Sequence, residues 1–175
     1  MSTTMKWGLI TGAVYVIFSL INNLLGVSEG GGFSMIGLLT NTLILGATFF
    51  TIYTGVKEIR DNAFEGYLTF GQGFKSGMAI ALIAAIIVAI FTYVYIAFID
   101  PGMIDKIIAT TEAQWEEQNM SDAQMDQARS MMGYFMNPFI MCLIAAVSVI
   151  FWGVIKSLVS AALLKKEAPL VISED

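Results

Sequence analysis

Four long stretches of this 175-residue chain contain no Asp, Glu, Lys or Arg: residues 7–28, 30–56, 76–99 and 130–155. A helix crosses the roughly 30 Å hydrocarbon core of a bilayer with about 20 residues, because each residue adds about 1.5 Å. Each stretch is therefore long enough to span a membrane. The sequence predicts an all-α polytopic membrane protein that forms one integral membrane domain over residues 1–175, with transmembrane helices at about 7–26, 35–56, 76–99 and 138–164.

The lysines and arginines between the stretches indicate how the chain is oriented. Six of them precede the first span, connect the second and third, or follow the last: Lys6, Lys57, Arg60, Lys75, Lys165 and Lys166. The segment 100–137 holds two, Lys106 and Arg129, beside seven acids. Because loops rich in Lys and Arg remain in the cytoplasm, we expect a bacterial inner-membrane protein with both termini cytoplasmic and residues 100–137 periplasmic.

Small residues recur every four positions along the third span, at Gly73, Gly77, Ala81, Ala85 and Ala89. Such a stripe lets another helix approach closely, which is a principal source of cohesion between helices in lipid. We expect it to form a packing seam. The sequence leaves open whether the partner helix belongs to the same chain or to a second copy in a homodimer.

The segment 100–137 predicts two short amphipathic helices. Asp100 and Pro101 suit the N-cap and first position of one helix, which continues with apolar residues at helical spacing to Trp115. Ser121 and Gln124 have the spacing of a capping box for the second, which runs to Asn137. We expect both helices to pack over the bundle. The alternative is a docking face for a partner, made of Trp115, Met125, Met132 and Phe135, with Met131 and Met136 as further adaptable apolar side chains.

Lys156 is the one charge that falls within a plausible span, as an intramembrane or interfacial group. A charge inside the membrane is a functional hypothesis by default. About 20 residues from the outer end of the last helix already cross the bilayer, so we expect the long Lys156 side chain to reach the inner interface. The alternative is a buried lysine that hydrogen-bonds Thr11, Thr51 or Thr54.

The chain lacks the residues that several kinds of functional site need. The chain has no His and a single Cys, which excludes disulfide frameworks and Cys/His metal clusters. The glycine-rich residues 66–77 fail the phosphate-loop pattern because Phe74 stands where a glycine must precede Lys75-Ser76, and we expect an interfacial turn there instead. We therefore expect no catalytic residues, no metal, no cofactor, and no nucleotide or nucleic-acid partner.

Several short motifs, in order along the chain, carry a resemblance to a known family. They are Arg60-Asp61-Asn62, the run from Phe70 to Gly77, Phe98-Ile99-Asp100-Pro101, and Met120-Ser121 leading to Met125 and Ala128-Arg129. The chain resembles the domain-of-unknown-function family numbered 4199, small four-helix membrane proteins found mainly in Bacteroidota. The resemblance implies one integral membrane domain with an outward loop between the third and fourth helices. It implies no activity and no catalytic residue.

These observations favour a protein that binds a partner over one that catalyses a reaction. We expect a non-enzymatic membrane scaffold or accessory subunit that contacts a membrane-protein partner through its outer helical loop or its small-residue seam. A small oligomeric transporter or channel is the alternative. No Asp or Glu lies within the four uncharged stretches, which disfavours proton-coupled transport because proton relays usually need intramembrane carboxylates or histidines.

Overall fold

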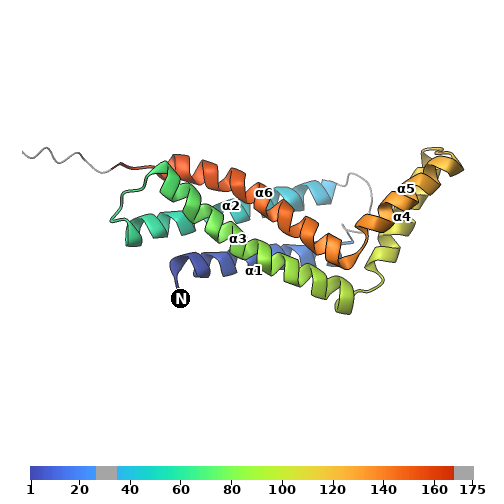
Figure 1. The fold of residues 1–175 in the computed structure, drawn as a ribbon, viewed down its shortest axis with the longest axis horizontal. Helices are drawn as coiled ribbons and strands as arrows, with labels where there is room; N and C mark the ends of the chain where they lie inside the picture. Colours follow the sequence, from blue (N-terminus) through green and yellow to red (C-terminus); the bar gives the residue numbers. More distant parts are fainter. Residues whose placement is uncertain (27–34, 168–175) are drawn as a thin grey trace, which may run out of the picture.

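The protein is an all-α bundle with a helical hairpin at one end (Figure 1). The structure is a computed structural model that describes residues 1–26 and 35–167. Its helices are α1 (Thr3–Leu24), α2 (Met35–Ala63), α3 (Phe70–Val94) with a π-helical turn η1 (Tyr95–Ile99), α4 (Met103–Glu117), α5 (Asp122–Phe135) and α6 (Pro138–Leu164). Four of these are long and apolar enough to cross a membrane: α1, α2, α3 with η1, and α6. The expected polytopic architecture, with two short helices before the last span, is confirmed.

The helices extend beyond the uncharged stretches at the end expected in the cytoplasm. α2 continues past Val56 to Ala63 and so includes Lys57 and Arg60, whereas the first residues of that stretch, 30–34, lie outside the described part. Charged residues such as Lys, Glu and Arg are good helix formers. An uncharged stretch therefore predicts the part of a helix that lies in lipid, and the helix itself can continue past it.

The interfacial turn expected over residues 66–77 is much shorter in the structure. α3 begins at Phe70 because Thr69 caps it: the Thr69 N–H donates to Gln72 Oε1 at 2.9 Å, and the Gln72 N–H donates to Thr69 Oγ1 at 3.3 Å. Only Glu65 and Gly66 have left-handed backbone there, with φ of 52° and 84°. The remaining glycines of this run are helical, and two of them, Gly73 and Gly77, lie in close contact with α6.

The four long helices run alternately up and down the bundle (Figure 1). α1 begins and α6 ends at the same end of the molecule, and the chain between α2 and α3 lies there too (Figure 1). Leu68, from that connection, exchanges two backbone hydrogen bonds with Lys166, just past α6, at 2.8 and 2.9 Å. This short bridge fixes the loop against the end of the last helix.

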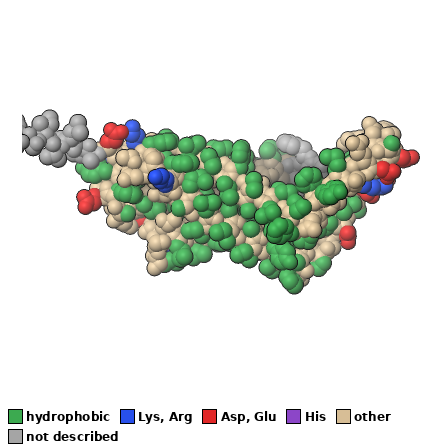
Figure 2. Space-filling model, in the orientation of Figure 1, with side chains coloured by type: hydrophobic (Ala, Val, Ile, Leu, Met, Phe, Trp, Pro, Cys, Tyr) green, Lys and Arg blue, Asp and Glu red, His purple; other side chains and the backbone are tan. Residues whose placement is uncertain are grey.

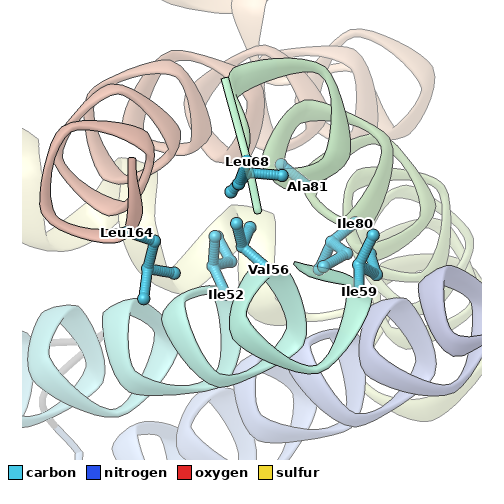
Figure 3. Close-up of a cluster of buried hydrophobic side chains, with 7 residues drawn as sticks. All are labelled: Ile52, Val56, Ile59, Leu68, Ile80, Ala81 and Leu164. Carbon is cyan, nitrogen blue, oxygen red and sulfur yellow. The ribbon is translucent and has the colours of Figure 1, made fainter. Parts of the chain in front are cut away.

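A compact apolar cluster holds this end of the bundle together (Figure 3). Its members come from α2, α3, α6 and the α2–α3 connection: Ile52, Val56, Ile59, Leu68, Ile80, Ala81 and Leu164. Many other large apolar side chains along the helices face outward. Figure 2 shows hydrophobic side chains over the length of the bundle, with charged ones gathered toward its two ends. Lipid solvates apolar side chains, so a membrane bundle can expose them, while small and polar residues mediate contacts between its helices.

The hairpin α4–α5 extends beyond the far end of the bundle (Figure 1). Neither helix contains a buried residue, so the expected packing of both helices over the bundle is wrong. The first turns of α4 reach the bundle, where Met103 and Ile107 line a hollow with Leu20 and Asn23 of α1. The acidic residues of the two helices stay in contact with water when the hairpin stands clear of the bundle.

Candidate functional site

The small-residue stripe of α3 lies against α6. A Cβ placed on Gly77 would come within 2.6 Å of Ser157 Oγ, and one on Gly153 within 2.6 Å of Ala81 Cβ. Gly73 faces Ala161 in the same way, at 3.0 Å. The two backbones can therefore meet only because these positions lack side chains.

The outer part of the stripe is less tightly enclosed. Ala85 is buried beside Val149 of α6, whereas Ala89 is half-buried in an apolar hollow with Phe139 and Cys142. The partner helix of the stripe is thus supplied by the same chain.

Lys156 lies inside the bundle and does not reach the interface. Only 4% of its surface is exposed, and its ammonium donates hydrogen bonds to Thr48 Oγ1 of α2 at 2.6 Å and to Tyr15 Oη of α1 at 2.9 Å. The expectation that its side chain extends to the membrane boundary is therefore wrong. The α6 face that carries Gly153 and Ser157 packs inward, and Lys156, next to Ser157 on the helix, turns inward with it.

The threonines expected as partners of a buried Lys156 bond elsewhere. Thr11 Oγ1 lies 2.9 Å from Thr51 Oγ1, and Thr54 donates to the carbonyl of Phe50 at 2.7 Å. Among the described residues, no carboxylate forms an ion pair with Lys156. Its positive charge is solvated by two neutral hydroxyls, an arrangement that is costly inside a membrane.

A cavity of about 240 Å³ lies beside this cluster, in the outer half of the bundle. All four long helices line it: Tyr15, Val16, Ser19 and Asn22 from α1, Ile44 from α2, Val88, Phe91 and Thr92 from α3, and Ala145 from α6. Tyr15 belongs both to the cavity wall and to the Lys156 cluster. The Asn22 Oδ1 atom is buried and has no hydrogen-bond partner. Buried polar atoms are normally bonded, so this one marks a place where a group can be accommodated.

Sequence reasoning missed Tyr15 and Thr48 as the partners of Lys156. A signal for the first was present, because Thr11, Tyr15 and Ser19 recur every four residues and so share one face of a helix. A polar stripe on an apolar span points inward. The register between α1, α2 and α6, which brings residues 15, 48 and 156 together, has no such signature.

In the outer hairpin, one ion pair joins the two helices. Arg129 of α5 donates to Glu112 of α4 at 2.6 Å, and this carboxylate raises the pKa of the Arg129 guanidinium. The Ser121 N–H donates to Gln124 Oε1 at 3.0 Å, as expected of a capping box. The first helix of the hairpin begins later than expected. α4 begins at Met103 after an N-cap at Gly102, so the expected start at Asp100 and Pro101 is wrong by two residues. Asp100 instead pairs with Lys106 at 3.3 Å.

The residues of the expected partner face differ in exposure. Trp115, Met125 and Met132 are half-buried, and Phe135 is exposed. Met131, which the sequence placed on this face, is exposed, and so is Tyr134, which it did not, at 74% of its surface. The exposed apolar face of the hairpin is thus made of Met131, Tyr134 and Phe135.

Comparison with known proteins identifies a family without an assigned activity. No curated protein and no solved structure matches the chain. The model of one family matches residues 6–166, a range that includes all four candidate membrane helices except the first three residues of α1. The chain therefore belongs to the family described as Protein of unknown function (DUF4199).

Proposed function

We propose that this integral membrane protein is a non-enzymatic scaffold or accessory subunit that binds a membrane-protein partner through its α4–α5 hairpin. The observation that supports this proposal is the position of the hairpin, which stands clear of the bundle and exposes Met131, Tyr134 and Phe135 (Figure 1). The small-residue stripe, the other expected contact surface, is occupied by α6 of the same chain. Exposed aromatic residues and methionines are the side chains that protein interfaces favour.

Affinity purification in a mild detergent tests the proposal. The wild-type chain should recover one membrane protein in a fixed ratio. The variant Met131→Ser, Tyr134→Ser, Phe135→Ser should lose it, whereas Asp105→Ser with Gln118→Ser, two exposed polar positions on the same hairpin, should retain it. Recovery of the chain alone, or equal recovery of the partner by both variants, would contradict the proposal.

We further propose that the protein lies in the bacterial inner membrane with its termini in the cytoplasm and the hairpin in the periplasm. The distribution of Lys and Arg supports this orientation, since six lie at the end where α1 begins and α6 ends. A periplasm-active reporter fused after Glu117 should be active, and the same reporter fused after Asp61 should be silent. The opposite pattern would reverse the orientation.

A small oligomeric transporter is a second candidate, favoured by the buried Lys156 and the cavity lined by all four long helices. Polar and ionisable groups inside a bundle commonly mark solute pathways. Flux of a solute across liposomes that contain only this protein would support transport, and a lack of flux together with a recovered partner would favour the scaffold.

A further inference from the structure

The buried ammonium of Lys156 leaves an unbalanced positive charge inside the bundle. Its two hydrogen-bond acceptors, Tyr15 and Thr48, are neutral hydroxyls, whereas an ammonium has three N–H donors. A charge at low dielectric attracts an opposite charge strongly over several ångströms. Because no carboxylate of the described chain pairs with Lys156, an anion from outside is the group that would complete the site.

The cavity next to Tyr15 has the dimensions and the lining for such an anion. It extends along α1 from Tyr15 to Asn22, about 10 Å at 1.5 Å per residue, toward the end of the bundle that carries the hairpin. Ser19, Asn22 and Thr92 contribute hydroxyl and amide groups, and a turn of the Asn22 amide about its last bond would present N–H donors in place of its unpartnered oxygen.

The remaining walls of the cavity are apolar. They are formed by Val16, Ile44, Val88, Phe91 and Ala145. A bare inorganic ion would gain nothing from these side chains, whereas a carboxylate with a short hydrocarbon tail would bury its tail against them. The lining therefore selects for an anion that is partly apolar.

We propose that this cavity binds a small organic carboxylate, with the anionic group held near Tyr15 by the charge of Lys156 and the tail against the apolar walls. The site is separate from the hairpin surface and does not depend on the proposed scaffold function. Lys156 does not line the cavity and acts through Tyr15, which accepts its hydrogen bond and does line the cavity, so Lys156 is a positioning residue.

Thermal unfolding of the full chain in neutral detergent tests the proposal, with butyrate as the probe and butyramide as its uncharged counterpart. Butyrate should raise the unfolding temperature with increasing concentration, because a ligand that binds only the folded state stabilises it. Butyramide should not. Lys156→Met should abolish the shift, and Lys75→Met, at an exposed lysine, should preserve it.

A second variant keeps the test decisive if Lys156→Met does not fold. Ile44→Trp places a large side chain into the cavity and should remove the butyrate shift while leaving Lys156 in place. Equal shifts with butyrate and butyramide, a shift that survives Ile44→Trp, or no shift in the wild type would each overturn the proposal.

The same carboxylate chemistry could reach the cavity from a lipid. Nanodiscs of neutral lipid, with and without phosphatidylserine, distinguish the two sources. Stabilisation by phosphatidylserine that Ile44→Trp removes would identify a lipid headgroup carboxylate as the occupant, and stabilisation by butyrate alone would identify a free acid.

Discussion

At the scale of single residues, Lys156 shows how a charge is accommodated in an apolar bundle. Its long side chain could have reached the interface, yet only 4% of its surface is exposed, because the face of α6 on which it lies turns inward and its ammonium bonds Thr48 of α2 and Tyr15 of α1. Two hydroxyls then replace part of the water that the ammonium would have at the interface. Such a residue is retained at a cost in stability, which is why a buried charge points to function.

Replacement of Thr48 by Val should destabilise the protein, because it leaves Lys156 with one acceptor in place of two. A buried donor that loses its partner costs about 1–3 kcal/mol. Thermal unfolding in detergent measures the change. Thr42→Val, an exposed threonine on the same helix whose hydroxyl bonds only the carbonyl of Leu38, is the matched control and should be nearly neutral. Equal effects of the two substitutions would show that Thr48 does not support Lys156.

The glycines of the membrane helices differ in how much space surrounds them. Gly77→Leu should lower the stability by about 1–3 kcal/mol or more, as overpacking does, because its Cβ would meet Ser157 at 2.6 Å, and the Ser157 backbone leaves no room to adjust. Gly46→Leu, on α2, meets nothing within 4 Å and should be tolerated. The unfolding temperatures of the two variants check this prediction, and a stable Gly77→Leu protein would mean that α3 and α6 are not in close contact.

At the scale of elements, the helices of the bundle and those of the hairpin are held by different forces. α3 packs on α6 through small residues, so close contact between backbones stabilises that pair. α4 and α5 bury no residue and are joined by the ion pair of Arg129 with Glu112. Exposed ion pairs contribute little to stability, so the hairpin should open far more readily than the bundle.

Arg129→Met should therefore increase hydrogen exchange of the backbone amides in α4 and α5 and leave the bundle unchanged. Glu112→Gln should loosen the contact between the helices in the same way, and the double variant should add nothing to Arg129→Met, because both substitutions remove the Arg129–Glu112 pair. Arg129→Met also removes the longer pair of Arg129 with Asp126 within α5, at 3.4 Å. Asp105→Asn, at an exposed acid on α4 that forms no ion pair with another described residue, is the control. Additive effects of the two substitutions would show that the helices are joined by other contacts.

At the scale of the whole molecule, the apolar exterior is what makes the bundle a membrane protein. Ile86 and Ile90 of α3 are exposed on the side of the helix away from its buried small residues, at 60% and 61% of their surfaces. In water such side chains would favour aggregation, whereas lipid solvates them. The charged side chains visible on the surface lie toward the ends of the bundle, where both water and headgroups are available (Figure 2).

Ile86→Asp with Ile90→Asp should reduce insertion, because an aspartate near the centre of a membrane helix costs about 3 kcal/mol. The amount of protein that remains in membranes after an alkaline wash measures this. Leu at both positions should behave as the wild type. Full retention of the aspartate variant would show that this face of α3 does not contact lipid.

The number of membrane helices and the presence of two short helices before the last one can be predicted from the sequence alone. Both follow from local patterns: runs without charge for the spans, and helical spacing with the Ser121–Gln124 cap for the hairpin. Even the stripe from Gly73 to Ala89 was visible, since a period of four lies within one helix.

The surfaces that meet between the helices become known from the three-dimensional arrangement. It assigned α6 as the partner of the stripe, placed Lys156 between Tyr15 and Thr48, and separated the hairpin from the bundle. The partners of Lys156 lie 141 and 108 residues away along the chain, and their contact depends on the rotation and depth of three helices at once. The spacing of apolar residues specifies that a helix crosses the membrane, but lipid surrounds every span alike, so the contacts between spans come from packing.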